Sequence, residues 1–261
     1  MILDKIAEKT RRRIEAEKER ISAVQMRQMA LGMDTGKGRP LERAFAEREL
    51  SFICEVKKAS PSKGVIAEDF PYLQIAKEYE EAGAAAISVL TEPYFFQGKD
   101  AYLAEIAEHV HIPVLRKDFV LEPYQIYQAR IIGASAVLLI CSLLDEKKLK
   151  MFVSIAQRLG LSPLVEAHTE AEIAMALASG TEIIGVNNRD LATFEVDIST
   201  SARLRKLVPD NLFFVSESGI RSGEDIKQLK KDGVNAVLIG ETLMRSPDKK
   251  AALAELRGEQ A

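Results

Sequence analysis

GASAVLLICSLLDEKKLKMFVSIAQRLGLSPLVEA, residues 133–167, contains two short apolar runs, SAVLLIC and SPLVEA. The chain between them has room for a loop, a helix of three or four turns and a second loop. Both runs are apolar at nearly every position, as strands covered on both faces must be. A strand, a helix and a second strand in this order predict a βα repeat with parallel strands.

The same rhythm runs from residue 52 to the end of the chain. A glycine precedes every second apolar run. Each of these glycines follows a helical segment, at the place where left-handed backbone commonly ends a helix. Eight such units predict one (β/α)8 barrel, because an open doubly wound sheet rarely needs eight and no G-x-G-x-x-G turn is present. The glycines are Gly83, Gly133, Gly180 and Gly233, and the other runs are FICEV (52–56), AAAISVL (84–90), IPVLR (112–116), EIIGVN (182–187), LFFVSE (212–217) and NAVLIG (235–240).

Residues 1–48 differ from the rest of the chain. Ile2, Ile6, Ile14 and Ile21 recur among lysines, arginines and glutamates, which predicts an amphipathic helix. A glycine-rich break at residues 32–40 leads to a second short helix, LERAFAEREL. We expect an N-terminal helical extension over residues 1–48, packed as a flap on a barrel over residues 49–261. A partner-binding arm is the alternative.

Composition limits the possible functions. The 261 residues carry a net charge of −3, which argues against bulk nucleic-acid binding. The N-terminal segment lacks the apolar centre of a signal peptide, and no run approaches the ~20 residues that span a bilayer. Cys54 and Cys141 lie in apolar runs, as buried thiols in a reducing compartment do. We expect a cytoplasmic protein without membrane or nucleic-acid partners, monomeric, with a homodimer left open.

Charged residues end the odd-numbered strands. Glu55 and Lys57 follow the first strand, Lys117 the third, Glu166 the fifth and Glu217 the seventh. Barrel active sites lie at these carboxyl ends, so the set predicts acid–base chemistry on an anionic substrate, although any one residue alone would more often be a solvated rim charge. The pleat turns residues 55 and 57 to one side and residue 54 toward the helices. We expect neighbouring cations to lower the pKa of the lysine.

The last two strands end in glycine, in VSESGI (215–220) and LIGE (238–241). Gly219 and Gly240 would offer backbone N–H groups where barrels often bind phosphate. The loop KKASPSKG (57–64) adds cations and hydroxyls, and its small residues predict a mobile lid.

Polar residues also follow the sixth strand. Asn187 and Arg189 would bind a substrate's hydroxyls and carboxylate. For Asn188 and Asp190, an Asx turn is a serious alternative to a role in binding. The three histidines lack metal-ligand spacing, so solvated or hydrogen-bonding roles are expected for them, His168 included.

Two further local patterns bear on the site. TEPYFFQG (91–98) offers aromatic rings to an apolar substrate, although packing against helices is equally open for Tyr94 and Phe95. Thr169 with Glu172 predicts a capping box at a helix start.

Taken together, these residues resemble the indole-3-glycerol-phosphate synthase family of tryptophan biosynthesis. The resemblance covers essentially the whole chain, and its combination of motifs is specific. The matching stretches are EVKKASPSKG (55–64), SVLTEPYFFQG (88–98), VLRKDF (114–119), LVEAH (164–168), GVNNRDL..F (185–194), VSESGI (215–220) and LIGETLM (238–244).

The resemblance implies a lyase that closes, decarboxylates and dehydrates 1-(2-carboxyphenylamino)-1-deoxy-D-ribulose 5-phosphate to indole-3-glycerol phosphate, without cofactor or metal. Lys117 matches the general acid for the ribulose carbonyl, and Glu166 matches the acid or base of water loss, with Glu55 and Lys57 also implicated. Asn187 and Glu217 match residues that position the hydroxyls and the anilino nitrogen. The remaining matches fall on the carboxylate side (Arg189), the phosphate side (Ser60, Lys57, Ser218, Gly219, Gly240 and the Glu241 backbone) and the substrate-binding wall (Phe119).

Two other functions stay open on the sequence. A phosphoribosylanthranilate isomerase would be a barrel with a related substrate, but that family would lack the pair EVKKASPSKG and VLRKDF. A catalytically silent barrel that serves as a binding partner is the alternative from a different class.

Overall fold

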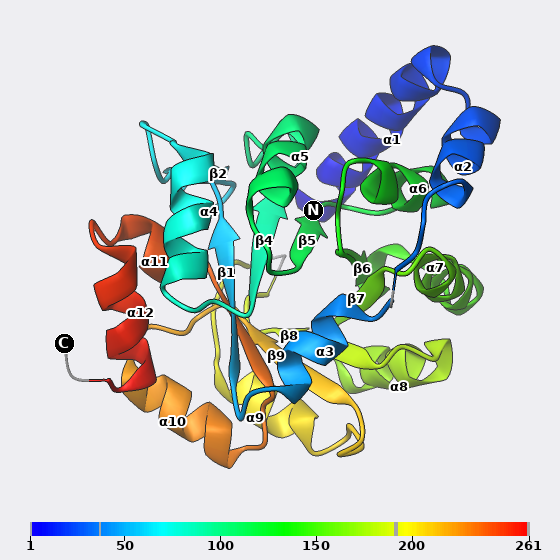
Figure 1. Ribbon diagram of the computed structural model, residues 1–261. Coiled ribbons are helices and arrows are strands. Elements are labelled where there is room, and N and C mark those ends of the chain that lie inside the picture. Colours follow the sequence, from blue (N-terminus) through cyan, green and yellow to red (C-terminus); the bar gives the residue numbers. More distant parts are fainter. Residues whose placement is uncertain (1, 37, 191–192, 260–261) are drawn as a thin grey trace.

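The computed structural model describes residues 2–36, 38–190 and 193–259. Within them, the main sheet is a closed parallel barrel in the order β1-β10-β9-β8-β7-β6-β5-β4 (Figure 1), which confirms the predicted (β/α)8 fold and excludes the open sheet. Leu191 of the GVNNRDL..F stretch lies outside the described residues. The barrel strands are β1 (Ser51–Val56), β4 (Ala86–Leu90), β5 (Val114–Lys117), β6 (Ala136–Ile140), β7 (Ser162–Ala167), β8 (Ile183–Asn187), β9 (Phe213–Glu217) and β10 (Ala236–Ile239).

Helices alternate with these strands and surround the barrel (Figure 1). The predicted glycines end helical segments with positive φ, Gly83 at 82° and Gly180 at 81° among them. The surrounding helices are α4 (Tyr72–Glu81), α5 (Asp100–His109), α6 (Pro123–Ile131), α7 (Glu146–Arg158), α8 (Glu170–Ser179), α9 (Ser199–Arg205), α10 (Gly223–Lys231), α11 (Glu241–Arg245) and α12 (Lys249–Arg257), with a 3-10 turn at Cys141–Leu143.

Side chains on each strand divide between two apolar layers. Ile53 belongs to the cluster inside the barrel, whereas its neighbour Cys54 belongs to the larger cluster between the strands and the helices. Burial raises the pKa of the Cys54 thiol to about 12, as expected for a packing residue. The alternation leaves inward positions at the strand ends for the site.

Helix α3 (Pro40–Ala46) closes the amino-terminal end of the barrel. Leu41 and Phe45 join the interior cluster, and the Leu41 N–H donates to Ser162 Oγ at 3.0 Å, where β7 begins. Phe45 also meets Phe213 of β9 edge to face. The sequence predicted this helix over residues 41–50. The helix observed is shorter, and it begins at a proline, a residue that suits the first position of a helix.

Helices α1 (Ile2–Arg20) and α2 (Ala23–Leu31) lie at the opposite, carboxyl end of the strands (Figure 1). Ile14 and Met26 pack with Tyr124 of α6. Arg13 donates to both oxygens of Asp118 at 2.9 and 2.8 Å, directly after β5. The boundary at residue 48 between an extension and a barrel stays a prediction.

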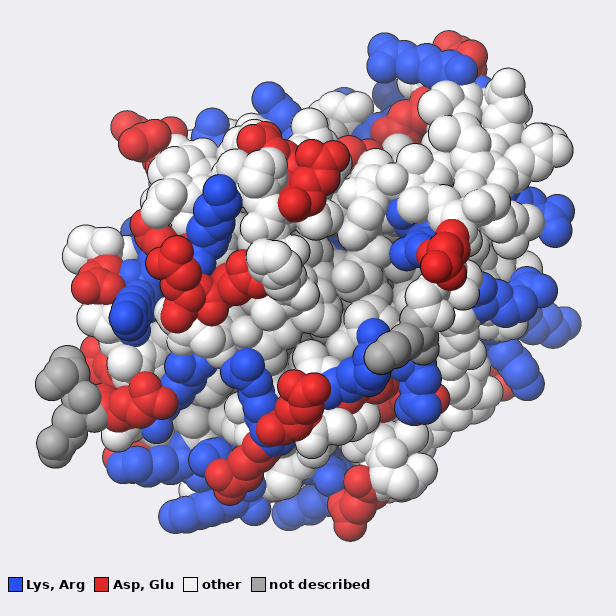
Figure 2. All heavy atoms as spheres, in the orientation of Figure 1, with Lys and Arg blue, Asp and Glu red and all other residues white. Residues whose placement is uncertain are grey.

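The lid loop is more regular than expected, because β2 (Ala59–Ser60) and β3 (Gly64–Val65) pair as a short antiparallel ladder. Among the described residues, no helix is both long and apolar enough to cross a membrane. Figure 2 shows basic and acidic side chains interspersed over the visible face, which agrees with the small net charge.

Candidate active site

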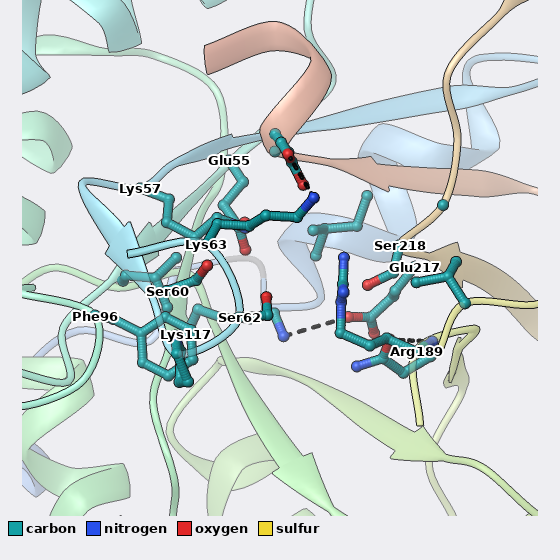
Figure 3. A pocket seen from close by; sticks show the side chains of 18 of the residues that line it. Glu55, Lys57, Ser60, Ser62, Lys63, Phe96, Lys117, Arg189, Glu217 and Ser218 are labelled. Carbon is teal, nitrogen blue, oxygen red and sulfur yellow. Dashed lines mark hydrogen bonds and ion pairs between the residues drawn. The ribbon is translucent and has the colours of Figure 1, made fainter. Parts of the chain in front are cut away.

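Charged side chains from four strand ends line one cavity, and Figure 3 labels those from β1, β5 and β9. In the closed sheet, β5 stands opposite β9 and β1 stands opposite β7. Nζ of Lys117 lies 3.5 Å from Oε2 of Glu166 and 3.3 Å from Oε2 of Glu217. Glu55 forms an ion pair with Lys57, so these two side chains share a side as the pleat predicted. The structure thus brings all five predicted acid–base residues together.

Burial and charge set the protonation states here. Burial by itself would lower the pKa of Lys117, but Glu217, Glu166 and Glu55 outweigh it and raise that pKa. The expected lowering is wrong, because the near neighbours of this ammonium group are carboxylates rather than cations. Burial raises the pKa of Glu217 to about 7 against the attraction of Lys117. Lys117 therefore stays charged, and the pKa of Glu217 lies near neutrality.

Glu217 depends on a glycine that sequence reasoning overlooked. Its side chain is buried, and apart from the ion pair of Oε2 with Lys117 neither carboxylate oxygen has a hydrogen-bond partner among the described residues. A Cβ at Gly185 of the neighbouring strand β8 would collide with this carboxylate. The bare backbone at residue 185 therefore makes room for Glu217, whose acceptors remain open to a ligand's donors.

The cavity has a volume of about 800 Å³, enough for a phosphorylated substrate with an aromatic ring. One wall is apolar, and there the rings of Phe96 and Phe119 lie 5.9 Å apart. Phe119 lines the cavity, and after β4 the aromatic side chain that lines it is Phe96. Tyr94 is exposed instead, beneath Lys9 of α1. Other apolar lining residues are Ile2, Leu3, Ile6, Leu90, Leu138 and Ile140.

The predicted phosphate side forms another wall of the same cavity. Ser218 and Gly219 both have left-handed backbone, with φ of 67° and 84°, and such a conformation is strained for serine. At Gly240 a Cβ would press on the Glu55–Lys57 pair, so this glycine also protects the ion pair. Lining residues on this side are Lys57, Ser60, Lys63, Ser218, Gly219, Gly240, Glu241 and, unforeseen from the sequence, Arg221 and Arg245.

The polar cluster after β8 divides differently from the expectation. Asn187 reaches the cavity, yet its Oδ1 also accepts from the Arg189 N–H at 3.1 Å, which is the Asx turn expected of its neighbours. Asn188 is buried and donates to Ser216 Oγ and Ser218 O, both at 3.0 Å, so it supports the strained turn. Arg189 lines the cavity, as expected, and Asp190 accepts from the Thr193 N–H at 2.9 Å.

His168 lies behind Glu166 rather than in solvent. Its Nε2 is 3.5 Å from Oε1 of Glu166, and its Nδ1 is 3.4 Å from Oε2 of Glu172. The capping box predicted at Thr169 is half formed, since Thr169 Oγ1 accepts from the Glu172 N–H at 3.2 Å. The Glu172 carboxylate accepts from the His168 N–H at 2.6 Å, which brings it against the imidazole.

Within the part of the chain that the structure describes, no group of three His, Cys, Asp or Glu side chains is arranged to hold a metal ion. The acid–base residues form ion pairs with one another instead. The expectation of metal-free and cofactor-free chemistry stays a prediction.

Comparisons with known proteins agree with the geometry. Residues 3–256 match the family model described as Indole-3-glycerol phosphate synthase. The chain is 58% identical over 258 residues to a protein of that name from Ruminiclostridium cellulolyticum, covering 99% of both chains. It is 55% identical to another from Endomicrobium trichonymphae, covering 98% of this chain and all of the relative.

Solved structures add support for the fold alone. The 3-hexulose-6-phosphate synthase of Salmonella typhimurium superposes with a TM-score of 0.65 at 13% identity, over 80% of this chain and 97% of that one. A tryptophan synthase alpha-subunit mutant from Pyrococcus furiosus superposes with a TM-score of 0.61 at 17% identity, over 80% and 98%.

Proposed function

Because the chain belongs to the indole-3-glycerol phosphate synthase family, we propose that its barrel mouth performs the family's reaction through Lys117 and Glu166. The enzyme is a decarboxylating, ring-closing lyase of tryptophan biosynthesis. Its substrate is 1-(2-carboxyphenylamino)-1-deoxy-D-ribulose 5-phosphate, and its products are indole-3-glycerol phosphate, carbon dioxide and water. The observation that carries the assignment of roles is the Lys117 ammonium group, held between two buried carboxylates at the centre of the cavity.

Ring closure turns the ribulose carbonyl into a hydroxyl group, and Lys117 donates the proton that this oxygen needs. Its raised pKa keeps the ammonium charged, and Glu166 and Glu217 hold it across the mouth. The iminium formed by closure then accepts the electron pair left by carbon dioxide. Arg189 binds the carboxylate before it departs, and the apolar wall at Phe96 and Phe119 holds the aromatic ring.

Loss of water needs a proton on the new hydroxyl and a base for the neighbouring ring carbon. We assign these late transfers to Glu166, because Lys57 is already paired with Glu55. Asn187 and Glu217 position the hydroxyls and the anilino nitrogen. The phosphate binds on the side formed by Ser60, Lys57, Ser218, Gly219, Gly240 and the backbone of Glu241.

Residues 1–48 act as one extension that completes the mouth, since Leu3 and Ile6 line the cavity and Arg13 binds Asp118. The enzyme works in the cytoplasm as a monomer, without nucleic acid or membrane. Light scattering checks the monomer, because a homodimer would double the mass.

An activity assay tests the function and its independence of metal together. Purified protein is treated with a chelator and mixed with the anilino-ribulose substrate, and indole fluorescence is followed. The proposal requires equal product formation with and without the chelator. Absence of product in both samples contradicts the function, whereas loss only after chelation contradicts the metal-free mechanism.

A further inference from the structure

The proposed reaction consumes a proton. The substrate's carboxylate leaves as neutral carbon dioxide, so its negative charge must be balanced from outside. Ring closure adds one proton to the carbonyl oxygen, and dehydration adds a second to the departing hydroxyl. Rearomatisation returns only one, from the ring carbon. Each turnover therefore takes up one proton from solvent.

Three titratable side chains, Glu166, His168 and Glu172, lie in a row that begins at the mouth on β7 and ends at the start of α8. Glu166 is 1% exposed, and Nε2 of His168 lies 3.5 Å behind its Oε1, buried and without a hydrogen-bond partner among the residues that the structure describes. The other ring nitrogen, Nδ1, faces Glu172 at the start of α8. The side chains of His168 and Glu172 are 17% and 19% exposed, so the row runs from a buried carboxylate to one that reaches solvent.

A second cavity, of about 790 Å³, lies where this row ends. His168 and Glu172 line it, together with Ser142 and Thr200, whereas Glu166 and Lys117 line the main cavity and not this one. Asn187 lines both cavities, so the two spaces are neighbours. Solvent in the side cavity can therefore reach the outer end of the row while substrate covers the inner end.

We propose that His168 and Glu172 form a proton relay that recharges Glu166 from the side cavity during turnover. The inference rests on the proposed role of Glu166. The His168 imidazolium donates its Nε2 proton to Glu166, and Glu172 holds the resulting neutral ring by its Nδ1–H. The neutral ring then turns Nε2 toward the side cavity, takes a proton from water there onto that nitrogen, and turns back. His168 thus acts through Glu166 and does not touch the substrate.

The charges around the His168 ring favour its protonated form, the imidazolium. Burial alone would lower the pKa of His168, but its contact with Glu172 and the charges of Glu166 and Glu217 raise that pKa overall. The Glu172 carboxylate has a lowered pKa and stays ionised beside the ring, because His168 outweighs the effect of burial. The titratable groups that face the ring or the side cavity are Glu166, Glu217, Glu172, Cys141, Asp190, Glu195, Asp197 and Arg203, with Lys117 beyond Glu166.

Single-turnover experiments test the relay, with proton uptake followed by an indicator dye and product by indole fluorescence. His168→Gln keeps a hydrogen-bonding side chain but cannot titrate. It should slow both signals by about tenfold or more, less than the ~10²–10⁴-fold loss of a direct acid or base. In wild-type protein the rate should fall as pH rises through the pKa of His168, and this fall should vanish in the variant.

Two further variants separate the relay from helix capping. Glu172→Gln can still accept from the His168 N–H but carries no charge, so it should move the same fall to lower pH. Thr169→Ala removes the cap of α8 without touching the relay, and its pH profile should match that of wild type.

An unchanged profile in both Gln variants overturns the relay, as does an equal change in Thr169→Ala. If His168→Gln does not fold, the Glu172→Gln profile alone decides between the two outcomes. Wild-type protein that makes no product would instead refute the proposed function, so the two failures are distinguishable.

Discussion

Nζ of Lys117 lies 3.3 Å from Oε2 of Glu217, although their strands stand on opposite sides of the barrel. The contact spans the mouth and holds the ammonium group over the centre of the cavity (Figure 3). We therefore expect this lysine to deliver its proton to a ligand in the cavity rather than to solvent.

Lys117→Ala should lower kcat by roughly 10²–10⁴-fold through the loss of this general acid. Circular dichroism and steady-state fluorescence assays measure the fold and the rate. Lys58→Ala is the matched control. Lys58 also follows a barrel strand, β1, but does not line the cavity, so the variant should retain most of the activity. Near-wild-type turnover in Lys117→Ala would refute the assignment.

Glu217→Gln should change how stability depends on pH. The folded-state pKa of about 7 lies above the ordinary glutamate value of 4.5, so between these values the folded protein binds more protons than the unfolded chain. Stability from this group is therefore full below the unfolded pKa and is lost as pH rises through about 7. Denaturant unfolding at several pH values should show a shallower decline in Glu217→Gln. An unaltered decline would show that Glu217 is ionised throughout.

Gly185→Ala should impair activity through Glu217. The added methyl group would collide with the buried carboxylate, and overpacking of this kind costs about 1–3 kcal/mol in the free energy of unfolding. The rate should fall while the double variant Gly185→Ala, Glu217→Ala recovers stability, because the collision is gone. Equal destabilisation in both backgrounds would mean that the methyl group meets something other than Glu217.

Arg13→Ala should destabilise the fold and lower activity together. Asp118 is fully buried and follows Lys117 directly, and loss of Arg13 leaves it with Arg116 at 3.4 Å and Thr91 at 2.8 Å. We expect a loss of about 2–3 kcal/mol, below the ~3–5 kcal/mol of a buried charge left without a partner. Arg12→Ala removes an exposed pair with Glu8 and should cost under ~1 kcal/mol. Similar losses in the two variants would contradict the buried role of Arg13.

The sequence predicts the barrel well because the period-two alternation and the helix-ending glycines are local signals. Cys54 and Glu55 face opposite sides as the pleat requires, and Lys117, Glu166 and Glu217 meet because strand ends share one rim. Those predictions need no knowledge of distant contacts.

Contacts that depend on packing were missed. Arg13 and Asp118 are far apart in sequence, and nothing local marks them as partners. The sequence around Gly185 does not mark it as special, because its role comes from Glu217, which the neighbouring strand places beside it. The pKa of Lys117 was misjudged because the sequence shows which charges share the rim but not which ones are nearest.

The division of labour between Lys117 and Glu166 is the central claim, and single-turnover kinetics of Glu166→Gln test it most directly. The substitution preserves shape and removes the titrating group, so it should impair the steps after decarboxylation. Carbon dioxide release and indole fluorescence are followed in the same reaction. The account predicts that carbon dioxide appears well before fluorescence in the variant. Equal slowing of the two signals would place Glu166 at or before decarboxylation and contradict the account.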